Sequence, residues 1–125
     1  MKKRVLSVGQ CVPDQNAIAR MLAGRYGAEV LKADKADDAL AALRSAPIDL
    51  VLVNRKLDCD YTDGLDIIRQ IKADATLTHI PCMLVSNYTE HQDTAVAAGA
   101  QRGFGKAELD HPQTQERLQQ VLSPS

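Results

Sequence analysis

Short apolar runs alternate with segments of helical period along the chain, and this alternation constrains the fold more than any other feature of the sequence. The runs are rich in Val and Leu, as expected for buried strands. In the segments between them apolar residues recur with a helical period, so that Ile18, Met21 and Leu22, for example, share one helical face. The sequence therefore predicts strands at residues 5–8, 29–31, 50–53, 82–85 and 102–104, each followed by a helix.

Repeated strand–helix alternation indicates a parallel sheet with helices on both faces, because parallel strands need a crossover connection. Right-handed crossovers leave few topologies, and 2-1-3-4-5 is a common order for a sheet of this size. We predict an α/β fold, a doubly wound parallel sheet of five βα units in this order. The length of 125 residues suits one domain over residues 1–125, with a core at about 4–122 and a tail or the start of a linker at 123–125.

Polar and glycine residues between the runs predict where several helices begin and end. Asp14 lies where the first helix should begin and is a candidate N-cap residue. Gly24 and Gly27 bracket the expected end of that helix. Thr89 and Gln92 have the spacing of a capping box, in which both side chains would cap the start of the fourth helix.

The charge balance disfavours some classes of partner. Lys and Arg number 15 and Asp and Glu 16, so we expect neither nucleic acid nor a membrane surface as partner, because such proteins usually carry a basic face. No run approaches the ~18 apolar residues that span a bilayer. Cys11, Cys59 and Cys82 have no CxxC spacing, which favours free thiols in a cytoplasmic protein.

The residues at the carboxyl ends of the predicted strands are the candidates for function, because ligands of such sheets bind at that edge. Asn54 directly follows the apolar run 50–53. A carboxamide is neutral, a poor nucleophile and a weak ligand for hard metal ions. The first strand ends at Gly9 and Gln10, which offer no carboxylate either.

Four segments follow one another in a specific order and spacing: the strand at 49–54 that ends in Asn54, the Asp-Gly helix start at 63–71, the strand at 80–86 that ends in Ser86, and the Gly-Ala unit at 98–100 followed by Lys106. In this order and spacing the chain resembles, over nearly its whole length, the receiver domain of two-component response regulators. The resemblance implies a flavodoxin-like fold and a role in phosphorelay signal transduction.

The departures from this family concentrate at its phosphorylation site. In the family's pattern two acids follow the first strand, an acceptor aspartate follows the third, and a switch aromatic and a Lys-Pro lie on the fifth unit. Ser86 and Lys106 alone match the catalytic pattern. Elsewhere this chain has Gly9 and Gln10 at the acidic pair, Asn54 at the acceptor, Gly103 at the switch position with Phe104 one place later, and Ala107 in place of proline.

These departures predict that Mg²⁺ binding is weak or lost, because Mg²⁺ requires hard oxygen ligands that are typically carboxylates. Lys106 would then stand without carboxylate partners, in a neutral or cationic pocket. Two arrangements satisfy it: an anion bound by Lys106, Ser86 and loop N–H groups, or a hydrogen bond that Lys106 donates to Asn54.

Two alternative interpretations use the acids of the loop after Asn54. Residues 58–62 match the DxDxT signature of haloacid-dehalogenase-type phosphatases, with Asp58 and Asp60 as the two acids. In those enzymes the signature directly follows a strand, whereas here residues 54–57 intervene. Asp58 could instead be a substitute phosphoacceptor in a phosphorelay. We favour neither alternative and expect no enzymatic activity.

The residues and the resemblance together predict an atypical receiver domain of a two-component pathway that acts through protein–protein interaction, independently of phosphorylation. By the resemblance, its partner surface is the stretch Thr89–Leu122, and homodimerisation through this surface stays open. Because Gly103 replaces the switch aromatic, we expect the link between the pocket and this surface to be broken or rewired.

Overall fold

A five-stranded parallel sheet organises the chain. The computed structural model describes residues 2–122, and its strands lie in the order β2-β1-β3-β4-β5. This confirms the predicted fold class and strand order; the expected tail at 123–125 lies outside the described residues. The elements are β1 (Arg4–Val8), α1 (Val12–Tyr26), β2 (Glu29–Ala33), α2 (Ala36–Ser45), β3 (Leu50–Asn54), α3 (Gly64–Ala73), β4 (Cys82–Val85), α4 (Thr89–Ala97), β5 (Gln101–Phe104), a 3₁₀ turn (Lys106–Glu108) and α5 (Pro112–Leu122).

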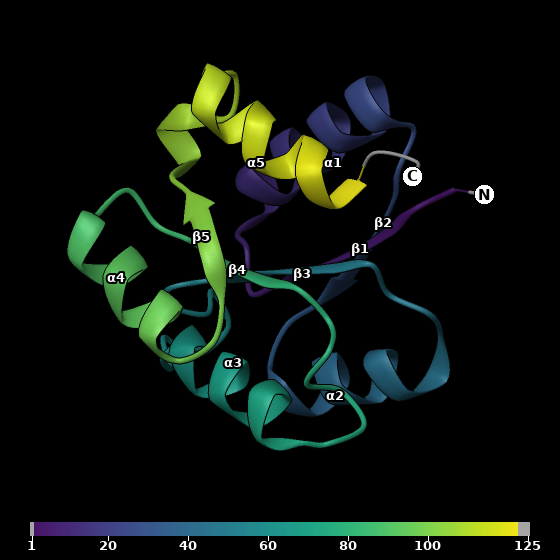
Figure 1. Ribbon diagram of the computed structural model, residues 1–125, viewed down its shortest axis with the longest axis vertical. Helices are drawn as coiled ribbons and strands as arrows, with labels where there is room; N and C mark the ends of the chain where they lie inside the picture. The colour runs from purple at the N-terminus through teal and green to yellow at the C-terminus, as the bar shows by residue number, and fades with distance from the viewer. Residues whose placement is uncertain (1, 123–125) are drawn as a thin grey trace.

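Helices cover both faces of the sheet. In Figure 1, α1 and α5 lie above the sheet, α2 and α3 lie below it, and α4 lies beside β5. Alternate strand residues point to opposite faces, so Val51 and Val53 of β3 pack toward α2 and α3, while Leu50 and Leu52 pack toward α1 and α5. Burial on both faces explains why the strands read as continuous apolar runs. Within residues 2–122, no helix is long and apolar enough to cross a membrane.

The predicted start and end of helix α1 are confirmed in part. Gly27 caps its carboxyl end with φ of 62°, and its N–H donates to carbonyls of the last turn. Gly24 lies inside the helix rather than at its end. The N-cap residue is Cys11, so the prediction of Asp14 as N-cap is wrong. Asp14 instead lies in the first turn, where its negative charge interacts favourably with the helix dipole. Its side chain forms an ion pair with Lys106.

The capping box predicted for α4 is also wrong. The N-cap residue is Tyr88, and no side chain caps this end of the helix. Thr89 is the first helical residue. Gln92 is buried and donates to β4 instead of reaching back to the helix start. Gln92 takes the contact with β4 because hydrogen bonds from a buried amide to strand carbonyls stabilise the fold more than an exposed capping hydrogen bond would.

Candidate functional site

An open pocket of about 470 Å³ lies at the carboxyl edge of the sheet, bordered by Cys11 after β1 and by the residues that end or follow β3, β4 and β5. Asn54, Ser86 and Lys106 all line it, so the structure brings together three residues that the sequence singled out. Gly9 and Gln10, at the end of β1, are not among its lining residues.

Asn54 uses its side-chain amide as a donor. The residue is 8% exposed, and its Nδ2 donates to the carbonyl oxygens of Gly9, at 3.1 Å, and Lys56, at 2.7 Å. These bonds join the loop after β1 to the loop after β3. No hydrogen bond connects Asn54 with Lys106, so the predicted bond between them is wrong.

Gly9 and Gln10 are enclosed by the loop after β3. Gly9 has φ of +75°, and a Cβ there would lie 2.4 Å from Cδ2 of Leu57. Its carbonyl also accepts the N–H of Asp58 at 2.9 Å. Gln10 is 3% exposed, and neither its Oε1 nor its Nε2 has a hydrogen-bond partner among the described residues. The end of β1 therefore contacts protein rather than an open ligand site.

Lys106 forms an ion pair, which corrects the prediction that it stands without a carboxylate. Its Nζ lies 2.7 Å from Oδ2 of Asp14, on the first turn of α1. The same oxygen accepts the thiol of Cys11 at 3.0 Å. Burial alone would raise the pKa of Asp14, but the hydrogen bonds from Cys11 and Lys106 and the lysine charge together lower this pKa. No sequence pattern pointed to this ion pair, because 92 residues separate its members.

Ser86 is held by the first turn of α4. Its Oγ lies 2.8 Å from Nδ1 of His91 and also accepts the N–H of Tyr88 at 3.3 Å. The ring of Tyr88 packs edge-on against His91, with ring centroids 5.2 Å apart. The sequence analysis did not identify His91 as a site residue. Its contact with Ser86 depends on the position of α4 over the end of β4, which the sequence does not specify.

Gln92 joins β4 to β5 below the pocket. The side chain is 5% exposed, its Nε2 donates to the carbonyls of Leu84 (2.9 Å) and Ser86 (3.1 Å), and its Oε1 accepts the N–H of Gly103 (2.9 Å). A Cβ at Gly103 would lie 2.2 Å from the carbonyl oxygen of Leu84. The position therefore has no room for a side chain of any kind. The neighbouring Phe104 lies in the core between the sheet, α1 and α5.

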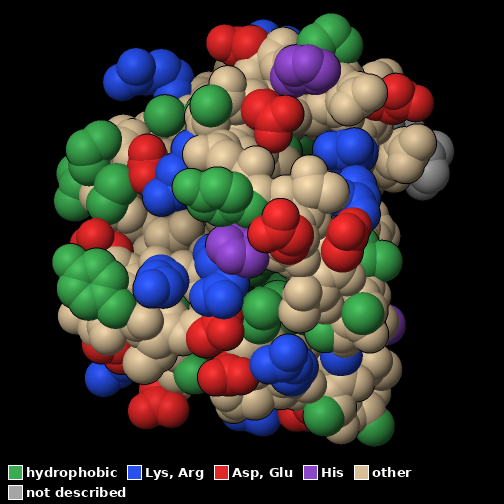
Figure 2. All heavy atoms as spheres, turned by 90° about the vertical axis from the view of Figure 1, so that its left-hand side faces the viewer, with side chains coloured by type: hydrophobic (Ala, Val, Ile, Leu, Met, Phe, Trp, Pro, Cys, Tyr) green, Lys and Arg blue, Asp and Glu red, His purple; other side chains and the backbone are tan. Residues whose placement is uncertain are grey.

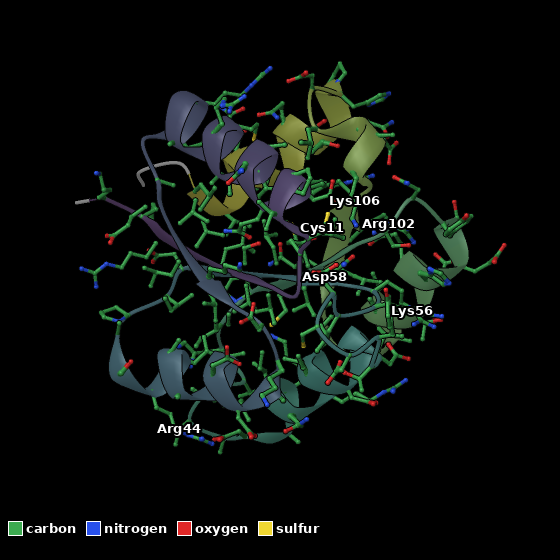
Figure 3. The ribbon with its side chains drawn as sticks, turned by 180° about the vertical axis from the view of Figure 1, so that it is seen from behind. Cys11, Arg44, Lys56, Asp58, Arg102 and Lys106 are labelled. Carbon is green, nitrogen blue, oxygen red and sulfur yellow. The ribbon has the colours of Figure 1, made fainter. Side chains whose placement is uncertain are left out.

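The acids of the loop after β3 face two different hollows. Asp58 lines the pocket and, in Figure 3, lies near Cys11 and Lys106 at the edge of the sheet. Asp60 lines a separate depression, and its Oδ1 accepts both the N–H (3.0 Å) and the hydroxyl (2.6 Å) of Thr62. The DxDxT signature is thus present in the sequence but does not bring its two acids to one site.

Known proteins share both the sequence pattern and the fold. The family model of the response regulator receiver domain matches residues 12–123. The chain belongs to this family. The receiver domain of NtrX from Brucella abortus is similar in structure, with 26% identity, a TM-score of 0.80, and coverage of 97% of this chain and 99% of that one.

Two further solved structures share the fold. The phosphorylated phytochrome response regulator RcpA from a cyanobacterium has 23% identity and a TM-score of 0.80, with 100% of this receiver domain and 97% of that chain covered. The chemotaxis protein CheY4 from Vibrio cholerae has 22% identity and a TM-score of 0.81, with 98% and 100% covered. No curated protein matches the sequence.

Proposed function

We propose that this receiver domain signals through protein–protein contact without aspartyl phosphorylation and without enzymatic activity. The observation that carries the proposal is the pair of hydrogen bonds from Asn54 to the carbonyls of Gly9 and Lys56. A carboxylate has only acceptors to offer, and at this position it would face two carbonyl oxygens. The amide at residue 54 is therefore part of the loop structure, and an acceptor aspartate would disturb that structure.

The residues at the family's metal position do not fit Mg²⁺. Gly9 has no side chain, Gln10 is a buried amide outside the pocket lining, and Asn54 is engaged with backbone carbonyls. Mg²⁺ binds through carboxylates and keeps several of its waters. Asp58 is the single carboxylate among the lining residues, and we assign no step of the function to a metal ion.

The partner surface that we propose is α4, β5 and α5, over residues 89–122. Gln92 joins β4 to β5, and Arg117 of α5 donates to the carbonyl of Gly103 at 2.8 Å. A Cβ at Gly103 would meet the backbone of Leu84, so the position cannot hold a switch aromatic, and this supports a surface that keeps one arrangement. A surface that keeps one arrangement suits a domain whose signal depends on the presence of a partner rather than on phosphorylation.

Intact-mass spectrometry after incubation with acetyl phosphate and Mg²⁺ tests the proposal. We expect no phosphoryl adduct on the wild-type chain or on Asn54→Asp, because the variant still lacks the acidic pair. An adduct on the wild type would overturn the proposal. Loss of that adduct in Asp58→Asn would then identify Asp58 as a substitute acceptor. Hydrolysis of p-nitrophenyl phosphate above the rate of an Asp58→Asn control would instead indicate a phosphatase.

A further inference from the structure

The pocket at the carboxyl edge is lined by cationic, hydrogen-bonding and aromatic side chains to which the proposed function gives no role. We propose that it binds an acidic side chain, a Glu or an Asp, carried by a segment of a partner protein. The inference rests on the proposed function, because a pocket that carries no acceptor carboxylate of its own at Asn54 can take one from a partner.

Cationic side chains outnumber acidic ones among the residues that line the pocket. Arg55, Lys56 and Lys106 line it, with Asp58 as the one acid among the lining residues. Lys56 is exposed and has no ion pair within residues 2–122. An incoming carboxylate would supply the partner that Lys56 lacks.

The other two cations are fixed in place by carboxylates outside the lining. Asp14 holds Lys106 at 2.7 Å, and Asp63 holds Arg55 at 3.2 Å. These pairs offset part of the positive charge, but they also remove the conformational entropy that free cations would lose on binding. Lys56 is therefore the lining cation without an ion pair, with Asp58 as the lining acid that offsets its charge, while Lys106 and Arg55 act as positioned donors.

Neutral donors complete the polar part of the pocket. The hydrogen bonds of His91 and Asn87 use Nδ1 of the histidine, which contacts Ser86, and Oδ1 of the asparagine, which accepts the N–H of Ala107. Nδ2 of Asn87 is left as a donor for a ligand, and Nε2 of His91 is a donor when Nδ1 accepts the hydroxyl of Ser86. Both residues line the pocket, so a carboxylate there would find donors besides the ammonium groups.

Two exposed tyrosines border the same pocket. Tyr61 is 76% exposed and Tyr88 is 64% exposed, and both belong to its lining. Tyr61 has φ of 60°, a conformation that a residue other than glycine rarely adopts, and its N–H donates to Leu57 at 2.7 Å. Tyr88 packs against His91. The two rings are thus presented from structured positions, as aromatic anchors of interfaces are.

The tyrosines favour a protein segment over a free anion. A small anion would contact the cations and leave both rings in water, whereas a peptide segment could place an acidic side chain in the pocket and cover the rings with its neighbours. Figure 2 shows this face, where hydrophobic, basic and acidic side chains lie around a histidine. The tyrosines and the cations of the lining match an acidic residue flanked by apolar ones.

Peptide titration of the ¹⁵N-labelled chain tests the docking site. The probes are two pools of pentapeptides, acetylated at the N-terminus and amidated at the C-terminus, with Leu, Val, Tyr or Ser at the flanking positions, one pool with Glu at the centre and one with Gln. We expect the Glu pool to shift the amide signals of Asn87 and His91. The affinity of the Gln pool should be lower by about fivefold or more. Lys56→Gln and Tyr88→Ala should each weaken binding of the Glu pool by about fivefold. Lys32→Gln, on the edge strand β2, is the matched control and should bind as the wild type does.

Three results would overturn the docking proposal. The first is no shift with the Glu pool. The second is equal binding of the Glu and Gln pools. The third is that sodium acetate or inorganic phosphate alone gives the same shifts at the same affinity, which would make the pocket a small-anion site. A mass adduct after acetyl phosphate treatment of the same sample counts against the proposed function instead, so the two failures are distinguishable.

Discussion

Gln92 and Gln10 are both buried amides at the carboxyl edge of the same sheet, yet their surroundings differ completely. Gln92 makes three hydrogen bonds and joins β4 to β5, whereas Gln10, after β1, has no partner for either polar atom among the described residues. The buried amide on the β4–β5 side thus has its polar atoms paired, and the buried amide after β1 does not. In this receiver domain the better satisfied of the two amides lies on the side that we propose as the partner surface.

The difference has a physical explanation. A buried amide stabilises a fold when its donors and acceptor meet backbone groups that would otherwise be unpaired, and it costs free energy when it meets none. Gln92 pairs with carbonyls and an N–H at the ends of two strands. Gln10 lies below the loop after β3, where the carbonyl of Gly9 is already bonded to Asn54.

The largest expected effect is on the β4–β5 side, at the switch position. Gly103→Tyr should lower the free energy of unfolding by about 4 kcal/mol or more, because any Cβ there meets the backbone of Leu84. Urea denaturation measures this loss. Gly24→Ala is the control: nothing lies within 4 Å of its Cβ, so it should gain about 0.5–1 kcal/mol. A Gly103→Tyr variant as stable as the wild type would show that β5 can move away from β4.

Removal of the Gln92 contact should be next in size. Gln92→Leu should cost about 3 kcal/mol, because it leaves the carbonyl of Leu84 and the N–H of Gly103 unpaired in a buried place. Chemical denaturation gives the loss, and hydrogen exchange at the amide of Gly103 should become faster in the same variant. Unchanged exchange there would contradict the role of Gln92 in joining the two strands.

Asn54 lies between the two regions and should have an intermediate effect. Asn54→Ala should cost about 2 kcal/mol, because the carbonyls of Gly9 and Lys56 lose a buried donor. Asn54→Asp at pH 7 should be at least as destabilised, since a carboxylate adds repulsion to the lost bonds. Thermal or urea unfolding of both variants checks this order. An Asp variant more stable than the Ala variant would remove the main argument against an acceptor at this position.

The β1 side should respond in the opposite direction. Gln10→Met should raise the free energy of unfolding by about 1 kcal/mol, because it replaces two unpaired buried polar atoms by apolar ones of similar volume. Urea denaturation measures both changes in the free energy of unfolding, and opposite signs for Gln10→Met and Gln92→Leu would confirm that the two buried amides differ. A loss at Gln10 of the size expected at Gln92 would mean that both amides are bonded in solution.

The smallest effect concerns the ion pair of Asp14 and Lys106. The pKa of Asp14 lies below its ordinary value of 3.8, so its contribution to stability is present above about that pH and is lost as the pH falls through the folded-state pKa. Lys106→Met should raise the pKa of Asp14, as followed by NMR of its carboxyl carbon. Lys32→Met should leave it unchanged. An Asp14 pKa that does not move in Lys106→Met would mean that Cys11 and the helix start alone lower it.

The fold and the location of the site could be predicted because they depend on local patterns. Apolar runs such as 50–53 specify strands, helical periodicity specifies the connections between them, and the handedness of these connections leaves few sheet orders. Parallel strands bring their carboxyl ends to one edge, so Asn54, Ser86 and Lys106 were expected to lie together, and they line one pocket.

Local patterns in the amino-acid sequence thus specify the sheet, its order and the neutral residues at its carboxyl edge. The side-chain contacts at this edge depend on how the elements pack: Asp14 with Lys106, His91 with Ser86, and Gln92 with two strands. Such contacts form between elements that the sequence does not place at hydrogen-bond precision, and a polar side chain takes the buried partner that the packed chain offers. Asp14 and Gln92 were predicted as helix caps for this reason, because a cap is the local choice and the buried contacts are not local.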